Sequence, residues 1–349
     1  MITTSIIIVG YNSLSDLERC LPSVLSTLEQ DSEIIVVDNH SSDGTAEKLP
    51  IIFPQIKLII SESNLGFGGA NNLGAQSAKG KYLVFLNPDT MVTSGWIISL
   101  LNPLINDQTI GMTTPKILQL NQPQKINTCG NDLHFSGLAL CRGMDRELSN
   151  FSEPENLNSI SGASFAISRE YFYELGGFDP TFFLYVEDTD LSLRCLLNGK
   201  RILFVPDALV YHDYKLNFGP KKVYYQERNR YYMLNKTFKP ITRYLISPIL
   251  FLSEILSWGY CLLNGKHNIQ NELDAYIWIH KHQEQTQLIF EKTQQLRKIS
   301  DYQLIKDFSW RIDFSQIAPP FFAFILHCFF DPLFFFSSRI SLWFISKES

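Results

Sequence analysis

Three widely separated parts of this sequence carry side chains suited to chemistry on a phosphorylated substrate. Asp89 follows directly after the apolar run 82–86, and a carboxylate at the end of a strand can hold a divalent cation against a diphosphate. The acidic cluster 187–190 offers a candidate general base, and His212 offers a candidate second metal ligand. Together these groups supply what transfer of a group from a nucleotide diphosphate requires.

The acidic cluster and the lone histidine also have ordinary structural interpretations. Carboxylates in the first turn of a helix offset the helix dipole, each by about 0.3 to 1 kcal/mol. The aromatic residues at 182, 183 and 185 instead indicate a partly desolvated setting, in which neighbouring carboxylates raise one another's pKa. One member of the cluster would then be a competent base near neutral pH. Arg194 is one helical turn beyond Asp190, so the spacing predicts an ion pair between them.

Two segments nearer the N-terminus have the features of a nucleotide pocket. Asp38 ends an apolar run and could accept the imide hydrogen of uracil or thymine, or only organise the following turn. The segment 64–74 is rich in glycine, and glycines before a helix let the backbone approach an anionic ligand. It departs from the dinucleotide fingerprint, because Asn71 stands where the third glycine belongs. The segment therefore favours a nucleotide-sugar loop over the loop of a dinucleotide oxidoreductase.

The elements that would position these residues alternate between strand and helix patterns. Short apolar runs joined by helices predict right-handed crossovers and hence a mostly parallel sheet, whose ligands gather at the carboxyl edge. A capping-box pattern at 15–18 predicts the start of the first helix, and a second helix is expected from about Gly69 to Ala78. The other predicted elements are strands at 5–9, 33–37, 56–60, 82–86, 201–205 and 208–211, short antiparallel strands and loops within 120–160, and a helix at 188–198.

Composition narrows the class of protein. The 349 residues exceed one typical domain, so a core of roughly 200 residues with an appended segment is expected. A net charge of -5 argues against a nucleic-acid binder. The six cysteines have neither metal-ligand nor disulfide spacing, which favours a reducing cytoplasm, and the apolar stretch 6–9 is too short for a secretory signal.

The ordered set of motifs resembles the inverting family 2 glycosyltransferases of the GT-A fold, and especially their bacterial rhamnosyltransferase-like branch. The resemblance runs through most of residues 1–215 and implies an α/β, Rossmann-like fold with a mostly parallel sheet flanked by helices. The matching segments are 5–13, 37–45, 64–72, 87–89, 162–163, 176–179, 183–194 and His212.

The resemblance also implies a role for each matching position. In such a protein Tyr11 and Asp38 flank the nucleotide base, and Asn87 lies beside the ribose. Many relatives carry aspartate where this chain has Asn87, which removes one charge. Asn64, Gly66 and Asn71 would line the nucleotide pocket. Asp89 and His212 would be ligands of Mg²⁺ or Mn²⁺, and Asp188 would be the general base.

The implied reaction is a single in-line displacement that inverts the anomeric carbon. The donor would be a nucleoside-diphosphate sugar, with rhamnose or another hexose as the sugar. The acceptor would be a saccharide, in particular a lipid-linked one, in cell-surface polysaccharide synthesis. A nucleotide-sugar-binding protein without turnover is the alternative.

The C-terminal part has a different character. Residues 1–215 are expected to form the catalytic domain and 216–349 a helical, membrane-interfacial segment. Basic residues interleaved with tyrosines at 215–243 suit an anionic bilayer surface or, alternatively, a solvated helix face. The apolar runs 244–263 and 319–336 are interrupted by polar residues, which favours helices lying in the membrane plane over spans. We therefore expect a cytoplasmic protein attached peripherally to the inner face of the plasma membrane.

Overall fold

The computed structural model describes residues 3–214 and 221–348, which belong to two compact units. The first, the sheet unit, comprises residues 1–131, 141–195 and 200–215. The second, the helical unit, comprises residues 132–140, 196–199 and 216–349.

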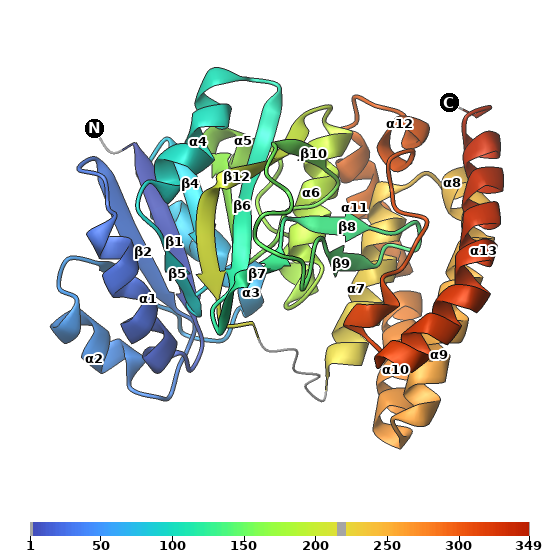
Figure 1. Cartoon of the computed structure of the whole chain (residues 1–349), viewed down its shortest axis with the longest axis horizontal. Helices are drawn as coiled ribbons and strands as arrows, with labels where there is room; N and C mark the ends of the chain where they lie inside the picture. The colour runs from blue at the N-terminus through green and yellow to red at the C-terminus, as the bar shows by residue number, and fades with distance from the viewer. Residues whose placement is uncertain (1–2, 215–220, 349) are drawn as a thin grey trace. The chain divides into compact units, whose positions relative to one another are not determined.

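The sheet unit is built on one twisted sheet with the strand order β10-β12-β6-β11-β4-β1-β2-β3 (Figure 1). Strands β1 to β4 run parallel, β12 runs parallel to β6, and β11 runs antiparallel between β4 and β6. The start of β11 therefore lies at the same edge as the carboxyl ends of β1, β2, β4 and β12. The strands are β1 Thr4–Gly10, β2 Ser32–Asp38, β3 Lys57–Ile60, β4 Tyr82–Leu86, β5 Thr90–Val92, β6 Ile110–Gln119, β7 Gln122–Thr128, β10 Glu155–Leu157, β11 Ser164–Ser168 and β12 Arg201–His212. The short strands β8 Asn131–Leu133 and β9 Ala139–Cys141 pair separately.

Helices cover both faces of this sheet, as the continuous apolar strands require. On one face, Ile6 and Ile8 of β1 pack in a core with residues of α1, α2 and α4. On the other face, the neighbouring Ile7 lies against Gly74 of α3, where a β-carbon would come within 2.6 Å of the isoleucine. Alternate residues of a strand thus serve opposite layers. The helices are α1 Leu14–Ser26, α2 Thr45–Ile52, α3 Gly66–Gln76, α4 Trp96–Asn106, α5 Arg169–Glu174 and α6 Glu187–Leu197.

Two predicted helix starts are wrong in detail. Helix α1 begins at Leu14, before the expected capping box, and its first free N–H group donates instead to the carboxylate of Asp43, 2.9 Å away. Helix α3 begins at Gly66, so the glycines form its first turns and Asn71 lies inside the helix. At α1 a tertiary contact with Asp43 replaces the predicted capping box. At α3 the glycine segment that was predicted to be a loop is itself helical.

Two strands also differ from the prediction. Strand β6 was not expected, because threonines, Pro115 and Lys116 interrupt its apolar residues. Strand β12 is one long element, whereas the sequence predicted separate runs, and its pairing with β6 shifts register between Val205 and Leu209. This irregularity allows the strand to pass Pro206, which has no N–H to donate.

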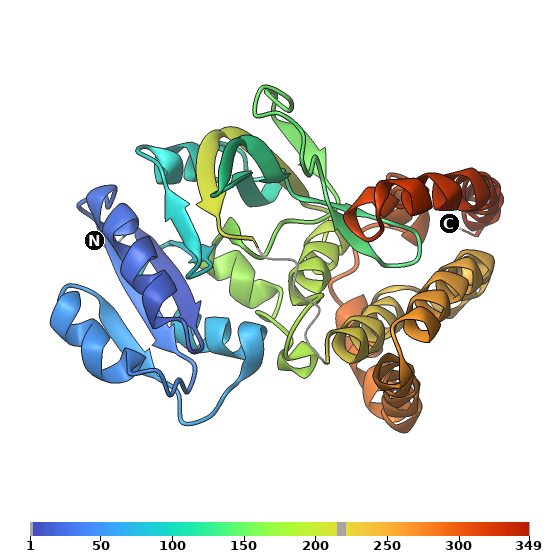
Figure 2. The same cartoon turned by 60° about the horizontal axis from the view of Figure 1, so that its bottom comes forward.

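The helical unit is a packed set of helices in which α10 contacts α7 and α9, and α13 contacts α9 (Figure 2). The Ser341 hydroxyl on α13 donates to the Leu245 carbonyl at 2.7 Å, which ties the last helix to the bundle. The helices are α7 Lys222–Thr237, α8 Pro240–Leu245, α9 Ser247–Leu263, α10 Lys266–Lys281, α11 Gln283–Gln294, α12 Asp301–Ile305 and α13 Pro320–Ile345.

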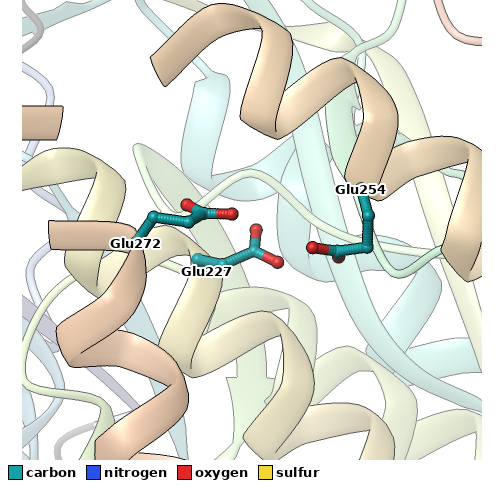
Figure 3. A group of neighbouring side chains, drawn as sticks. All are labelled: Glu227, Glu254 and Glu272. Atoms are coloured by element: carbon teal, nitrogen blue, oxygen red, sulfur yellow. The ribbon is translucent and has the colours of Figure 1, made fainter. Parts of the chain in front are cut away.

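Three glutamates from different helices converge inside the helical unit (Figure 3). Their oxygens already accept hydrogen bonds from neighbouring donors, among which Arg230 donates to both Glu227 and Glu254. The third glutamate, Glu272, accepts from the Ser257 hydroxyl at 2.9 Å and the Tyr276 hydroxyl at 3.0 Å. The cluster is therefore a polar network that joins α7, α9 and α10.

Three basic residues of α7 do not contribute to the expected bilayer-facing surface. Arg228, Arg230 and Lys236 are all buried in the helical unit. Lys215, at the start of the predicted basic stretch, lies outside the described residues. Buried cations serve internal pairing, as Arg230 does, and cannot reach anionic lipids.

Helix α13 is long and apolar enough to cross a membrane by length and composition, with 26 residues and a mean hydropathy of 1.6 in its most apolar window. One of its faces packs against the unit, through a stripe that includes Phe330, Phe334 and Ser338. The other face exposes large apolar side chains, among them Phe324, Phe329, Phe336, Ile340 and Trp343.

Candidate active site

Two strand ends bring the predicted base beside the predicted metal-binding turn. The N–H of Asn87, just after β4, donates to the carbonyl of Ala163, just before β11, at 2.9 Å. The adjacent Gly162 N–H donates to the Asp188 carboxylate Oδ2, also at 2.9 Å. The turn at 87–89 and the carboxylate of Asp188 thus share one short stretch of chain at the carboxyl edge of the sheet, which is where open α/β folds bind ligands.

Strand pairing also brings Asp89 and His212 together. Residues 90–92 form β5, and Thr90 is paired with His212 at the end of β12. The His212 Nε2 lies 3.2 Å from Asp89 Oδ1, and the backbone carbonyl of Asp89 accepts the Asp213 N–H at 2.9 Å. His212 Nδ1 lies 2.9 Å from Oδ1 of Asn127 on β7. A neutral imidazole that donates from Nδ1 to this amide oxygen presents the lone pair of Nε2 to Asp89.

This arrangement fits a divalent cation. Asp89 Oδ1 is buried and, among the described residues, accepts no hydrogen bond. When the imidazole is neutral, two lone-pair atoms face each other at 3.2 Å, and a bound cation would relieve their repulsion. Neighbouring ligands of an octahedral cation with bonds of about 2.1 Å lie about 3 Å apart. A carboxylate with an imidazole suits Mn²⁺, while the carboxylate with phosphate oxygens suits Mg²⁺.

The acidic cluster at the start of α6 divides into three environments. Asp188 Oδ1 accepts the Thr189 N–H at 2.7 Å, so with Gly162 each of its oxygens has one backbone donor. Burial raises the pKa of Asp188, and these N–H groups partly offset the rise. Burial and the charges of Asp188 and Asp190 raise the pKa of Glu187 to about 8.

The remaining carboxylate of the cluster has a structural partner. Arg194 NH2 lies 2.8 Å from Asp190 Oδ2, which confirms the predicted ion pair. The same guanidinium donates to the carbonyls of Leu175 and Gly177, at the left-handed glycine turn that ends α5. Arg194 thus anchors that turn to α6.

A strained turn precedes Asp188, the predicted base. Phe183, Tyr185 and Val186 have φ angles of 61°, 68° and 73°, a region that non-glycine residues rarely adopt and that costs about 1–2 kcal/mol for each residue. The Phe183 carbonyl accepts the Phe67 N–H at 2.8 Å, and a β-carbon on Gly66 would stand 2.1 Å from that oxygen. The glycine of α3 therefore permits direct contact between the glycine-rich segment and the turn that leads to Asp188.

The predicted nucleotide-binding residues lie along the same edge of the sheet, but they differ in how exposed their side chains are and in the hydrogen bonds that they already make. Tyr11 follows Gly10, which pairs with Asp38, and its side chain is 51% exposed. Asp38 is buried and its Oδ1 accepts the Ser41 N–H at 3.0 Å. Asn71 is only 2% exposed and donates to the Phe67 carbonyl at 3.0 Å, so its side chain supports the helix.

Asn64 and two residues that sequence reasoning missed complete the local scaffold. Asn64 Oδ1 accepts the Gly66 N–H at 2.9 Å and the Nδ2 group of Asn39 at 3.0 Å. The buried residues Asn39 and Asn127 were not predicted, although Asn39 directly follows Asp38 and is therefore at the expected edge. The sequence holds no comparable signal for Asn127, because its partner His212 is 85 positions away.

A mixed sheet flanked by helices on both faces, with a carboxylate–imidazole pair and a partly buried carboxylate at one edge, is typical of the class of GT-A folds. Residues 5–176 match the family model for Glycosyl transferase family 2. The chain therefore carries a domain of glycosyl transferase family 2, as the sequence resemblance predicted.

Two kinds of relative share this region. The chain is 32% identical over 241 residues to N-acetylgalactosaminyltransferase 7 of Drosophila melanogaster, a match that covers 62% of this chain and 41% of that protein. It is 28% identical over 236 residues to an N-acetylglucosaminyl-diphospho-decaprenol L-rhamnosyltransferase of Mycobacterium tuberculosis, covering 59% of this chain and 75% of that one. The chain thus spans about two fifths of the length of the first relative.

Solved structures support the fold. A crystal structure of GalNAc-T7 with UDP, GalNAc and Mn²⁺ is similar at a TM-score of 0.60 and 24% identity, covering 71% of this chain and 50% of that one. Staphylococcus aureus TarS in complex with UDP-GlcNAc is similar at a TM-score of 0.53 and 17% identity, covering 78% of this chain and 79% of the other. At these identities the likeness establishes the GT-A architecture.

Proposed function

We propose that this protein is a metal-dependent inverting glycosyltransferase that moves a hexose or deoxyhexose, with rhamnose as the first candidate, from a nucleoside-diphosphate donor to a saccharide acceptor. The observation that carries the proposal is the meeting at one sheet edge of Asp188 with the turn that holds Asp89 against His212. Membership of glycosyl transferase family 2 supports the same activity.

In the proposed reaction Asp188 is the general base. Oδ2 of Asp188 keeps a free lone pair after accepting the Gly162 N–H, whereas Oδ1 accepts both the N–H and the hydroxyl of Thr189. These donors fix the direction in which the Oδ2 lone pair points. The carboxylate removes the proton of an acceptor hydroxyl as its oxygen attacks the anomeric carbon. The bond from that carbon to the phosphate oxygen breaks, and the nucleoside diphosphate leaves with the electron pair. One displacement inverts the configuration.

Asp89 and His212 would hold Mg²⁺ or Mn²⁺. When bound, the cation supplies positive charge that stabilises the diphosphate leaving group. Asn127 keeps the His212 imidazole in the tautomer that a metal ligand needs, and the Asp213 N–H fixes the backbone of Asp89.

Tyr11, Asp38 and Asn87 are the proposed contacts to the nucleoside, with Asn64, Gly66 and Asn71 forming the glycine-rich loop around the donor. The exposed Tyr11 ring at the ends of β1 and β2 can lie against a base, while Asp38 offers the acceptor atom for an imide hydrogen. The side chain of Asn71 acts indirectly in this proposal, by holding the first turn of α3 through Phe67.

The exposed face of α13 supports the proposed location, which is the cytoplasmic face of the plasma membrane. Because its opposite face is packed against the helical unit, α13 is suited to lie in the membrane plane with one apolar side in the lipid. Attachment of this kind would bring the active site to a lipid-linked acceptor, the class of acceptor in the name of the Mycobacterium tuberculosis relative.

A panel of nucleoside-diphosphate sugars tests the function. Thermal stabilisation would be measured for dTDP-rhamnose, UDP-N-acetylgalactosamine and UDP-N-acetylglucosamine, each with and without Mn²⁺ or Mg²⁺. We expect one donor to stabilise the protein in the presence of metal and to be hydrolysed or transferred. Binding without turnover would instead establish the alternative, a nucleotide-sugar-binding protein. Absence of binding to any donor would reject both.

A further inference from the structure

Asn39 lies at the centre of the glycine-rich donor loop, although nothing in its residue type marks it as functional. It directly follows Asp38 at the end of β2, and its side chain is 3% exposed. Its backbone N–H donates to the Gly10 carbonyl at 2.8 Å, which fixes the residue to the end of β1. The side chain therefore projects from a rigid part of the sheet.

Three hydrogen bonds connect this side chain to the loop. The Nδ2 group of Asn39 donates to Asn64 Oδ1 at 3.0 Å and to the Gly66 carbonyl at 3.3 Å, and its Oδ1 accepts the Leu65 N–H at 2.8 Å. Both ends of one amide are thus used by three successive loop residues. Aspartate could still accept from Leu65, but it would place a negative oxygen against two oxygen acceptors.

The loop fixed in this way also supports the turn before the base. Gly66 packs directly on the Phe183 carbonyl, which accepts the neighbouring Phe67 N–H at 2.8 Å. Phe183 begins the left-handed stretch that leads to Asp188. A contiguous set of contacts therefore runs from the sheet through Asn39 and the donor loop to the turn that carries the base.

We propose that Asn39 is a positioning residue that fixes the donor loop 64–67, and through Phe183 the turn of the general base, relative to the sheet. The inference rests on the proposed function for its kinetic consequence. Its structural consequence, an ordered loop, is independent of turnover.

The variants Asn39→Asp and Asn39→Ala test the role, with Asn72→Ala as the matched control. Asn72 is on α3 and, like Asn39, uses both ends of its amide, donating to the Phe178 carbonyl at 2.8 Å and accepting the Phe178 N–H at 2.9 Å. Its loss should lower thermal stability to a similar extent without releasing the loop. A purely structural role for Asn39 would make the variants of the two positions behave alike.

Two measurements separate the outcomes. Amide hydrogen exchange of the peptide containing Leu65 to Phe67 should be slow in the wild type and faster in both Asn39 variants, but unchanged in Asn72→Ala. Calorimetry with UDP or dTDP and Mn²⁺ should show about tenfold weaker binding for the Asn39 variants, the loss expected when ordering of the loop is removed. With turnover, the donor KM should rise more than kcat falls, and the pH profile should be unchanged.

Slow amide exchange of the loop together with wild-type nucleotide affinity in either Asn39 variant would overturn the inference. Fast exchange of the loop in the wild-type protein would also overturn it, and that measurement requires no variant. If the wild type binds no nucleotide at all, the proposed function fails, while the exchange data still decide whether Asn39 orders the loop. The test needs only one of the two Asn39 variants to fold, because Asn39→Ala and Asn39→Asp each remove hydrogen bonds to the loop.

Discussion

The His212 Nε2 lies 3.2 Å from the Asp89 carboxylate, and the Nδ1 of the same imidazole lies 2.9 Å from Asn127 Oδ1. The proposed metal site would therefore depend on Asn127, a residue that does not itself bind the metal. Loss of such an outer partner lowers metal affinity in other proteins by about 10- to 100-fold.

Asn127→Ala should accordingly weaken Mn²⁺ binding by about 10- to 100-fold while leaving the protein folded. Without its partner the imidazole can turn or shift its proton to Nε2, which blocks ligation. Calorimetric titration of Mn²⁺ in the presence of a nucleoside diphosphate measures the change. Asn106→Ala, an exposed position on α4, is the control. Equal Mn²⁺ affinity in the two variants would contradict the assigned role.

Asp188→Asn should retain donor binding and lower turnover by about two to four orders of magnitude, the usual contribution of a positioned base. The amide can still accept from Thr189 or Gly162, but it cannot take up a proton. Transfer rate and donor affinity should be measured on the same preparation. Asp207→Asn, at an exposed position in β12, controls for the loss of one negative charge. Near-normal turnover would reject Asp188 as the base.

Because the pKa of Glu187 is raised in the folded protein, the free energy of unfolding should fall as pH rises. That pKa is raised from 4.5 to about 8 in the folded state, so the folded protein binds the proton more tightly than the unfolded chain does. The resulting stability is fully present below about pH 4.5 and is lost as pH increases through about 8. Thermal unfolding between pH 5 and 8.5 should show a steeper decline for the wild type than for Glu187→Gln. Glu174→Gln, exposed at the end of α5, should follow the wild type.

Gly66→Ala should lower the free energy of unfolding by more than the positive φ angle at this position alone predicts. Gly66 and Gly95 have φ angles of 71° and 77°, yet a β-carbon at Gly66 would stand 2.1 Å from the Phe183 carbonyl, whereas at Gly95 it would meet nothing within 4 Å. Gly95→Ala should cost about 1–2 kcal/mol, the strain of a left-handed residue. Gly66→Ala should exceed that cost in denaturant unfolding and should also weaken nucleotide binding. Similar losses in both variants would mean that the contact with Phe183 is not tight.

Charged substitutions on the exposed face of α13 test the membrane proposal. The double variant Phe329→Glu and Phe336→Glu should reduce co-sedimentation with lipid vesicles by at least about tenfold. The reason is that burial of each exposed phenylalanine in the lipid would contribute about 1.5–3 kcal/mol to the free energy of binding. The double variant Ile51→Glu and Ile52→Glu on α2, at positions that are 81% and 45% exposed, introduces the same charge on the sheet unit and is the control. Unchanged sedimentation of the double variant would argue against lipid contact through this face.

Sequence patterns predicted the parts of the site that follow directly from strands or helices. Asp38, Asp89 and His212 each come at or just after a strand end, and parallel strands place such positions at one edge. The Asp190–Arg194 pair follows from helical spacing alone. These features depend on local periodicity, which a single sequence contains.

The features that were missed depend on contacts between distant segments. Asn127 faces His212 only because β7 folds back along β6, and β6 itself was hidden by its polar and proline residues. The Asp43 carboxylate replaced the expected capping box for α1 through a contact between separate loops. Arg230 was interpreted as surface charge because sequence spacing does not reveal Glu227 and Glu254, the glutamates that pair with it.

The left-handed backbone at Tyr185 and Val186 has a consequence for protein engineering. Glycine at either position would relieve the strain, so screens that select for heat resistance would be expected to enrich it there. The same exchange would loosen the backbone immediately ahead of Asp188. Selection for heat resistance alone would therefore favour substitutions at these two positions that reduce how accurately the proposed base is held.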